Sequence, residues 1–586
     1  MHLLYDYQDD VEIKPIPFKG EWGFSTTVAF KIAGRQEKDF KKALKEVSEA
    51  IASHLEFGEE ISRIETVNGY INVYVNTNVY AQNLITSIME GDYGRGEKEE
   101  REKGKKGRKK KEKEEEKEKE KGREKGKKKE DKIMVEYSQP NTHKAFHIGH
   151  LRGTCLGASL VDILRYAGYE VVSANLINDT GSHVAKWLWC YLTYHKGEQP
   201  PEKKSKWLEG IYVEASHRLR EHPEYEKEVK KVLQKLEQKD KEIVELWEKT
   251  KQWSLGEFYR IYDELQVDFD VYFYDSSLYE EGKEIVNQLL DKGIAEQSEG
   301  AIIVDLDKQL DTDDLYKTYV ALRSDGTALY QTKDFALAKR KFEDYGIDRS
   351  IYVVGSEQKL HFNQVFKTLE LAGFEQAKKC FHLSYELVML KGGKMSSRLG
   401  NIIFYDDLYQ QVYQEALKEV EKREIVQQNK EETARIISLG ALKFSMLKKD
   451  NNKVIAFDPK EAVSFEGQTG AYIQYAHARA SRILEKEAPD IEQVTFHQLT
   501  KEEKNLLEQL AAFPDAVEQA AENYKPNILA HYVFDTAKAF NEFYHACPVL
   551  QAEPETKNAR LALVLATKIV LKKGLELLGI QAPERM

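Results

Sequence analysis

Hydrophobic residues near the N-terminus recur first at helical spacing and then in alternation. Between residues 24 and 55, apolar side chains fall three or four positions apart, at Phe40, Leu44, Val47 and Ile51. This spacing predicts that Phe24–Leu55 is helical. The run Gly69–Val75 alternates apolar and polar residues and is predicted to be a strand. We therefore expect a small α+β domain over residues 1–94.

A strand, a helix and a second strand are predicted in succession after residue 131. Lys132–Tyr137 is a short apolar run that suits a buried strand, and the turn-forming Gln139–Thr142 follows it. A helix is expected from about Gly149 to Leu164, and a strand over Tyr169–Ile177. Such a βαβ unit is typical of the parallel sheets that bind nucleotides.

The rest of the chain alternates between helical and strand patterns. Charged helical sequence from about residue 187 to 262 indicates an insertion into the sheet domain, placed at about residues 187–315. Three strands are predicted, the last two in the second half of the sheet: Ala301–Val304, Ala328–Gln331 and Ser350–Val354. From residue 431 onward the periodicity is almost entirely helical, as in Leu561–Leu578.

Together these patterns predict an α/β multidomain fold. The small α+β N-terminal domain would be followed by a Rossmann-like parallel-sheet domain over residues 133–430, with its helical insertion, and by an all-α C-terminal bundle over residues 431–586. A chain of 586 residues is long enough for three or four such domains.

Charge is distributed unevenly along the chain. Residues 97–132 hold 19 basic and 13 acidic residues with four glycines, which gives this segment a net charge of +6. Because the whole chain has a net charge of −11, the rest of the chain carries −17. This segment has no apolar side chain to bury, and we predict a disordered linker or insertion over residues 95–132. A basic arm that touches nucleic acid is the alternative, and the mixed charge favours the solvated linker.

Composition excludes some classes of protein. No apolar run approaches the roughly 20 residues of a membrane-spanning helix, and Met1–Glu12 lacks the pattern of a secretory signal, so a cytoplasmic location is expected. The four cysteines are too scattered for a CxxC zinc pair and are predicted to be reduced packing residues: Cys155, Cys190, Cys380 and Cys547. No metal-ligand set is predicted.

The segment Pro140–His150 carries the strongest chemical signal. It places His147, Gly149 and His150 at the start of a helix that directly follows a parallel strand. A helix N-terminus offers free N–H groups and the positive end of a dipole, which favour phosphate. The two histidines can add hydrogen bonds, and the glycine allows close approach of a base. The pattern predicts an ATP site, although histidines at this spacing also occur as packed or capping residues.

A second signal is the glycine-bearing loop Lys391–Asn401. Four of its residues are predicted to engage ATP or act in catalysis, namely Lys394, Met395, Ser396 and Arg398. Mobile cations in such a loop can stabilise the charge that develops on a triphosphate during nucleotidyl transfer. Taken alone, the loop also suits an ordinary basic surface.

Together, the two signals resemble the His-Ile-Gly-His and Lys-Met-Ser-Lys-Ser signatures of class I aminoacyl-tRNA synthetases. Within this class, several strings resemble arginyl-tRNA synthetases: Glu136–Asn141, His147–Thr154, Leu322–Thr327, Gly467–Arg479 and Ala582–Met586. The resemblance implies ATP-dependent activation of L-arginine and its transfer to tRNA(Arg), with Mg²⁺ accompanying ATP, no structural metal and a monomeric enzyme. A class I synthetase of other specificity and a catalytically inactive tRNA-binding homologue are the alternatives.

The resemblance also implies an arginine pocket. A guanidinium needs a carboxylate and a neighbouring aromatic or amide group, and Tyr330 and Asp334 suit this need, unless they are a packed tyrosine and a capping aspartate. Further arginine contacts are implied for Glu136, Ser138, Asn141, His150 and Gln358. Asp179 and Gly181 are expected to complete the floor of the site.

One departure from the family pattern concerns charge. Ser397 stands where the loop signature has its second lysine. Arginyl enzymes that lose this lysine tend to carry one shortly before the His-Ile-Gly-His motif, which here is Lys144. We expect Lys144 and Lys394 to share the phosphate charge.

The C-terminal bundle is expected to bind the tRNA anticodon. Aromatic, amide and cationic groups gather in one short stretch and suit unstacked RNA bases, namely Tyr472, Gln474, Tyr475, His477 and Arg479. Core packing is the alternative for the aromatic residues. The resemblance further implies that the N-terminal domain reads the elbow of the tRNA.

Overall fold

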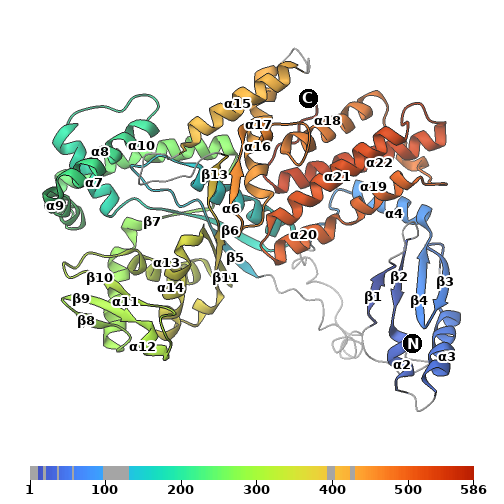
Figure 1. Cartoon of the computed structure of the whole chain (residues 1–586), viewed down its shortest axis with the longest axis horizontal. Coiled ribbons are helices and arrows are strands. Elements are labelled where there is room, and N and C mark those ends of the chain that lie inside the picture. The colour runs from blue at the N-terminus through green and yellow to red at the C-terminus, as the bar shows by residue number, and fades with distance from the viewer. Residues whose placement is uncertain are drawn as a thin grey trace, which may run out of the picture.

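The computed structural model describes residues 11–16, 22–35, 39–55, 58–96, 131–391, 403–422 and 429–586. These residues form a small N-terminal domain, a central α/β domain and a C-terminal helical bundle (Figure 1). Most of the charged segment, at residues 97–130, lies outside the described residues, and so do residues 392–402, which include nearly all of the glycine-bearing loop.

The N-terminal domain is built on a four-stranded antiparallel sheet in the order β1-β2-β4-β3. Its elements are β1 (Ile13–Pro15), β2 (Gly23–Thr26), α2 (Val28–Ala33), α3 (Phe40–His54), β3 (Ile61–Val67), β4 (Tyr70–Val75) and α4 (Thr77–Met89). The strand predicted at Gly69–Val75 is confirmed as β4. The helix predicted from Phe24 is wrong at its start, because Phe24 pairs with Val73 across the sheet.

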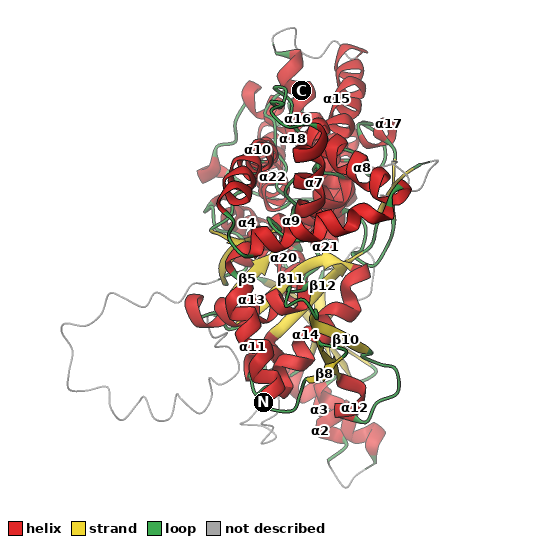
Figure 2. Cartoon of the chain, turned by 90° about the vertical axis from the view of Figure 1, so that its left-hand side faces the viewer, coloured by secondary structure: helices red, strands yellow, loops and turns green. Residues whose placement is uncertain are grey.

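The central domain contains a five-stranded parallel sheet in the order β12-β11-β5-β6-β7, which lies between layers of helices (Figure 2). The strands are β5 (Lys132–Glu136), β6 (Glu170–Ile177), β7 (Val271–Tyr274), β11 (Arg349–Gly355) and β12 (Cys380–Tyr385). Alternate residues of β5 enter two cores: Ile133 packs with the C-terminal helices, and Met134 with the opposite layer. The predicted βαβ unit is confirmed, with α6 at Ile148–Tyr166 between β5 and β6.

Helices and a second sheet fill the intervals between these strands. The helices are α7 (Ser182–Tyr194), α8 (Ser205–Glu221), α9 (Glu226–Glu237), α10 (Lys241–Leu265), α11 (Tyr279–Asp291), α12 (Leu306–Leu310), α13 (Tyr330–Tyr345) and α14 (Lys359–Leu371). The second sheet is antiparallel, in the order β10-β9-β8, and consists of β8 (Glu296–Ser298), β9 (Ala301–Asp305) and β10 (Thr318–Leu322).

Two expectations for this region are corrected. The strand predicted at Ala328–Gln331 is wrong, because α13 begins at Tyr330 and only Ala328 forms an isolated bridge, with Leu322. Its run of three apolar residues, Ala328–Tyr330, does not distinguish a strand from the first turn of a helix. In addition, β7 belongs to the main sheet although it falls within the range predicted as an insertion, since it pairs with β6.

The C-terminal region is helical, as predicted, apart from one short strand. Its elements are α15 (Tyr405–Lys422), α16 (Lys430–Leu447), β14 (Ile455–Phe457), α17 (Pro459–Ala462), α18 (Gly470–Lys486), α19 (Lys501–Ala511), α20 (Phe513–Glu522), α21 (Pro526–Ala546) and α22 (Pro554–Leu577). Strand β14 pairs in parallel with β13 (Val388–Leu390), which precedes the glycine-bearing loop.

The bundle and the sheet domain share one hydrophobic core. Leu151 and Leu160 of α6 belong to the same buried cluster as Leu529 of α21 and Leu571 of α22. Ser159 also donates a hydrogen bond of 2.9 Å to the carbonyl of Leu577. Helix α6 is therefore fixed between the sheet and the bundle.

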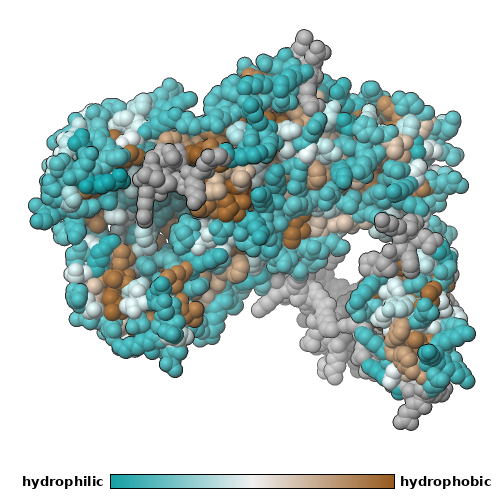
Figure 3. Space-filling view, viewed as in Figure 1, coloured by the Kyte–Doolittle hydropathy of each residue, from teal (hydrophilic) through white to brown (hydrophobic). Residues whose placement is uncertain are grey.

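The surface is mostly hydrophilic on the face drawn in Figure 3, which is hollowed between the helices α7–α10 and the subdomain that contains β8–β10. Among the residues that the structure describes, none of the helices combines the length and apolar character needed to cross a membrane.

Candidate active site

The predicted site residues gather at the carboxyl edge of the parallel sheet. Strands β5 and β11 are neighbours, but the chain proceeds from β5 to β6 on one side and from β11 to β12 on the other. The crevice at such a reversal of strand order is where open α/β sheets bind ligands. At this edge, the loops after β5, β6 and β11 carry predicted site residues. Helix α13 also begins at this edge, because the chain runs through it to the start of β11.

His147 and His150 form the N-terminal cap of α6. The Nδ1 atom of His147 accepts the backbone N–H of Gly149 at 3.1 Å, and Nδ1 of His150 accepts that of His147 at 3.4 Å. The two rings stack with centroids 3.9 Å apart. Because each Nδ1 accepts a hydrogen bond, each neutral ring carries its proton on Nε2. Both histidines can therefore donate from Nε2 to a phosphate.

The same histidines are neutral at physiological pH. Burial, followed by the charge of Lys144, lowers the pKa of His147 to about 4. Burial lowers the pKa of His150 well below its ordinary value, with further contributions from His147 and Lys144. As neutral rings, the two histidines can offer hydrogen bonds but no positive charge. Gly149 is required beside them, because a Cβ there would lie 2.9 Å from the His147 ring.

Lys144 lies on the same side of the site as the two histidines. Its Nζ is 4.3 Å from the centroid of the Tyr212 ring, a cation–π contact with helix α8. The loop residues predicted to cooperate with it lie outside the described residues, namely Lys394, Met395, Ser396 and Arg398, as does Ser397.

Substitution of Lys144 by alanine is expected to slow the arginine activation that the sequence resemblance implies by more than about threefold, because the cation expected to share the phosphate charge is lost. The measurement is the steady-state rate of arginine-dependent ATP–pyrophosphate exchange with tRNA present. Lys186→Ala is the matched control, since Lys186 pairs with Glu226 on the insertion. A Lys144→Ala rate within about threefold of the wild type would contradict the proposed charge sharing.

The turn between β5 and α6 has an unusual backbone. Ser138, Gln139 and His143 have φ values of 78°, 45° and 63°. Non-glycine residues adopt this region at a cost, and such strain persists only where the surroundings enforce it. The turn is therefore held by contacts from outside it.

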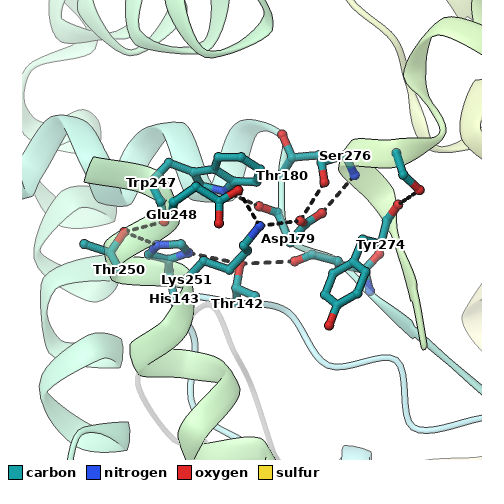
Figure 4. Close-up of polar contacts among 12 residues, drawn as sticks. Thr142, His143, Asp179, Thr180, Trp247, Glu248, Thr250, Lys251, Tyr274 and Ser276 are labelled. Atoms are coloured by element: carbon teal, nitrogen blue, oxygen red, sulfur yellow. Dashed lines mark hydrogen bonds and ion pairs between the residues drawn. The ribbon is translucent and has the colours of Figure 1, made fainter. Parts of the chain in front are cut away.

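Helix α10 supplies most of these contacts. Ser138 Oγ lies 2.8 Å from the hydroxyl of Tyr262, and the backbone N–H of His143 donates to Ser254 Oγ at 2.8 Å. His143 Nε2 also lies 2.8 Å from Thr250 Oγ1 (Figure 4). These α10 residues were not predicted from the sequence. Ser138 Oγ also accepts a hydrogen bond of 2.8 Å from Thr154.

The buried His143 is expected to make stability fall in weakly acidic solution. Burial lowers its pKa to about 3, so between pH 6.5 and 3 the unfolded chain binds a proton that the folded protein does not. Stability is then lost as the pH falls below 6.5, by about 2 kcal/mol between pH 6.5 and 5. Urea unfolding at the two pH values measures this loss.

The control for this prediction is the exposed His497. The His143→Gln variant is expected to lose less stability than the wild type between pH 6.5 and 5, whereas His497→Gln is expected to lose the same amount. An unchanged pH dependence in His143→Gln would show that other groups cause the acid sensitivity.

Asp179 organises the end of β6. Its buried carboxylate accepts the backbone N–H and the hydroxyl of Ser276 at 2.9 and 2.7 Å, and Lys251 Nζ lies 3.5 Å away (Figure 4). Trp247 donates from Nε1 to the Asp179 carbonyl at 2.7 Å. Burial raises the pKa of Asp179. Gly181 caps α7 with a φ of 109°, which favours glycine. Both residues fix the framework of the site.

Glu136 at the end of β5 already has a cationic partner. It forms a buried ion pair with Lys341 of α13 and accepts a hydrogen bond from Gln139 Nε2 at 2.7 Å. The Lys341 ammonium lies 3.5 Å from the centroid of the Tyr352 ring. The charge of Glu136 is therefore already balanced by Lys341 before any arginine substrate binds. Lys341 was missed by sequence reasoning, because a lysine on a charged helix carries no sign that it is buried.

Tyr330, Asp334 and Gln358 lie on two elements that are in contact, Tyr330 and Asp334 on α13 and Gln358 at the start of α14. Tyr330 and Asp334 are one turn apart on α13, and 54% of Tyr330 is exposed. Asp334 Oδ2 lies 2.5 Å from His361 Nε2 of α14, and Gln358 is the exposed N-cap of that helix. Asn141 bridges Asn178 at the adjacent ends of β5 and β6. Asp334 is thus a mostly buried carboxylate paired with His361, and the exposed Tyr330 ring lies one turn away on the same helix.

The five residues expected to meet RNA divide into two groups. Gln474 and His477 are fully buried and bond to the C-terminal segment, Gln474 to the carbonyl of Gln581 and His477 to that of Pro583, both at 2.9 Å. Their side chains are not available to RNA in this structure. Tyr472, Tyr475 and Arg479 are partly exposed.

A Rossmann-like parallel sheet whose first strand leads into a helix that opens with His-Ile-Gly-His defines the catalytic domain of a class I aminoacyl-tRNA synthetase. The family model described as "tRNA synthetases class I (R), catalytic domain" matches residues 115–458. The "DALR anticodon binding domain" matches residues 473–586, and the "Arginyl tRNA synthetase N terminal domain" matches residues 3–75. The chain belongs to the arginyl-tRNA synthetase family.

Individual relatives support this assignment. The arginine–tRNA ligase of Bdellovibrio bacteriovorus is 36% identical over 562 residues, which cover 94% of this chain and 90% of that protein. That of Clostridium acetobutylicum is 36% identical over 579 residues, covering 98% and 96%. The structure of Thermus thermophilus arginyl-tRNA synthetase is similar, with a TM-score of 0.74, 28% identity and coverage of 98% and 96%.

Proposed function

We propose that the chain activates L-arginine with ATP and transfers it to the 3′ end of tRNA(Arg). The α-carboxylate of arginine attacks the α-phosphate, which forms arginyl-adenylate and releases pyrophosphate. The terminal ribose hydroxyl of the tRNA then attacks the arginyl carbonyl and releases AMP. The observation that carries this proposal is the pair of neutral, stacked histidines at the start of α6, which lies at the reversal of strand order in a chain of this family.

The phosphate side of the site is assigned to α6 and the loop before it. The Nε2–H groups of His147 and His150 would donate to phosphate oxygens, and Lys144 would supply positive charge. MgATP is the substrate form expected for the family. Because positioning and charge stabilisation suffice for this transfer, no general base of large effect is expected.

The arginine side of the site is assigned to α13 and its neighbours. The Asp334 carboxylate would pair with the guanidinium in place of, or beside, His361, and the exposed Tyr330 ring would lie against it. Asn141 and Gln358 would contact the α-amino and carboxylate groups. Glu136 and Ser138, which are held by Lys341 and Tyr262, would shape the pocket next to these groups.

An aminoacylation assay with purified full-length protein, ATP, Mg²⁺ and total tRNA tests the proposal. Charging is expected with arginine and not with lysine, glutamine or methionine. Charging of another amino acid would indicate a different class I specificity. No charging by a folded protein that still binds tRNA would indicate an inactive homologue, the second alternative.

Arginine activation is expected to require tRNA, as the family resemblance implies. Omission of tRNA from an arginine-dependent ATP–pyrophosphate exchange assay should reduce the signal to background, and addition of tRNA(Arg) should restore it. A non-cognate tRNA is the control. Robust exchange without tRNA would contradict this expectation.

The tRNA contacts are assigned to two surfaces. The partly exposed Tyr472, Tyr475 and Arg479 of α18 would meet the anticodon region; Arg479 lies 4.8 and 5.0 Å from the rings of Tyr475 and Tyr544. The N-terminal domain would contact the elbow. We also propose a monomeric enzyme that acts in the cytoplasm, and light scattering of the purified chain tests the first point.

A further inference from the structure

Three residues of different chemistry meet where α7 ends and α8 passes beside it. Cys190 lies on α7, His195 caps the C-terminus of that helix, and Glu214 lies on α8. One ligand atom of each lies within 4.8 Å of those of the other two. By the helical rise, Cys190 is about 14 Å along α7 from Gly181, so the cluster belongs to the insertion and not to the active site.

The imidazole of His195 is oriented by carboxylates on both sides. Its Nε2 lies 2.9 Å from Oε2 of Glu214, and its Nδ1 lies 3.1 Å from Oε2 of Glu198. A histidine whose Nδ1–H is held by a carboxylate presents Nε2 as a lone-pair donor. The carboxylate of Glu198 can therefore hold a proton on Nδ1 and leave the Nε2 lone pair for a metal ion, once the metal takes the place of the proton between Nε2 and Glu214.

Glu214 is likewise held so that one oxygen remains for a ligand. Its Oε1 accepts a hydrogen bond of 2.8 Å from Arg218 Nε and forms an ion pair with Nη2 at 2.7 Å. The guanidinium also stacks on the Tyr194 ring, 3.7 Å from its centroid. Because Arg218 uses only Oε1, Oε2 faces His195 and the thiol side of the cluster.

We propose that this cluster is a zinc site, with Cys190 Sγ, His195 Nε2 and Glu214 Oε2 as protein ligands and water in the fourth position. Zinc accepts sulfur, nitrogen and oxygen ligands together, and a thiol selects it over Mg²⁺ or Ca²⁺. On binding, the metal displaces the thiol proton and any proton shared between His195 and Glu214, and both go to solvent. The thiolate and the carboxylate balance the charge of the ion.

The surrounding residues match what a metal site of this kind requires. Ligating histidines commonly donate their second N–H to a carboxylate, as His195 can to Glu198, and ligating carboxylates are hydrogen-bonded in turn, as Glu214 is by Arg218. The site would join the end of α7 to α8 and so brace the insertion that also contains α10. Residues 190, 195 and 214 match no short zinc motif, which is why the sequence predicts no structural metal.

The competing interpretation is an ion-pair cluster in which His195 is an imidazolium between Glu198 and Glu214. That arrangement does not need the thiol of Cys190, whereas a zinc ion at the cluster would bind it as a ligand. The role of Cys190 therefore distinguishes the two interpretations.

Zinc titration of the full-length protein, stripped with a chelator, tests the proposal. We expect about one equivalent of tightly bound zinc by competition with a chromophoric chelator. Cys190→Ala is expected to weaken binding by at least about 100-fold, and Glu198→Gln, which removes only the outer contact, by about 10- to 100-fold. Cys380→Ala, on β12, is the matched control and should bind zinc as the wild type does.

Substitution of cobalt for zinc provides a readout that a change in folding does not imitate. A near-ultraviolet thiolate-to-cobalt charge-transfer band is expected in the wild type and in Cys380→Ala, and its absence is expected in Cys190→Ala. Wild-type protein that takes up less than about 0.1 equivalent of zinc, or Cys190→Ala that binds as tightly as the wild type, would overturn the proposal. Glu198→Gln keeps the test valid if Cys190→Ala fails to fold.

Discussion

Replacement of His150 by alanine is expected to lower the rate of arginine activation by about 10²- to 10³-fold, the usual effect of removing one preorganised donor from a developing charge. The reason is geometric: Nδ1 of His150 accepts the backbone N–H of His147, so Nε2–H is the ring group left to donate to the phosphates of the proposed ATP site. The KM for arginine should change little. Single-turnover formation of arginyl-adenylate in the presence of tRNA measures the effect.

Two variants sharpen this experiment. His150→Gln places an N–H near the position of Nε2 and is expected to recover part of the lost rate, whereas His497→Ala alters an exposed histidine of the C-terminal region and should be neutral. A His150→Ala enzyme with a rate within about fivefold of the wild type would mean that the histidine serves only as a helix cap.

The second large effect is expected for Asp334→Asn. Loss of the carboxylate should lower kcat/KM for arginine by about 10²- to 10³-fold, as loss of one partner from a desolvated charge pair costs about 3–4 kcal/mol. The loss should reside mainly in the KM for arginine, with the KM for ATP unchanged. Steady-state exchange kinetics at varied arginine concentration separate these terms.

The control for Asp334 lies on the same helix. Asp344 of α13 is exposed, so Asp344→Asn should leave the KM for arginine unchanged. If Asp334→Asn raises the KM for ATP as much as that for arginine, the carboxylate acts on the framework and not on the guanidinium. His361→Ala separates the two roles further, because it removes the present partner of Asp334 and leaves the carboxylate in place.

The sequence predicted the elements with a strong period. Helix α6 was expected at residues 149–164 and spans 148–166, and β6 was expected at 169–177 and spans 170–177. Both elements are buried, so their apolar pattern is imposed by the core. The motif at His147 and His150 could be placed at the carboxyl edge of the sheet because it follows the predicted strand β5 directly.

What the sequence did not reveal are contacts between segments far apart in the chain. The partner of Glu136 is Lys341, and the turn at His143 is held by Thr250 and Ser254 of α10. Nothing in the local sequence of these partners distinguishes them from ordinary polar helix residues. Only the packing of the insertion on the sheet brings them to the site.

For the polar residues of α18, the sequence predicted contacts with RNA where the structure shows burial. Gln474 and His477 have the chemistry of RNA-binding residues, but the fold buries them against the C-terminal segment. The sequence alone does not distinguish a buried polar side chain that bonds to the backbone from an exposed one that can bind RNA. Tyr472, Tyr475 and Arg479 remain the prediction for RNA contact.

The core shared by α6 and the C-terminal bundle has a consequence for how the protein is divided. Leu151 and Leu160 of α6 pack in one cluster with residues of α21 and α22, and Ile85 of α4 belongs to that cluster as well. The sheet, α2 and α3 of the N-terminal domain share a separate core around Ile51 and Ile71. A fragment cut between the catalytic and anticodon-binding sequences would expose both halves of one apolar interior to water. Two different family models match these two regions, but the shared core makes them a single folding unit.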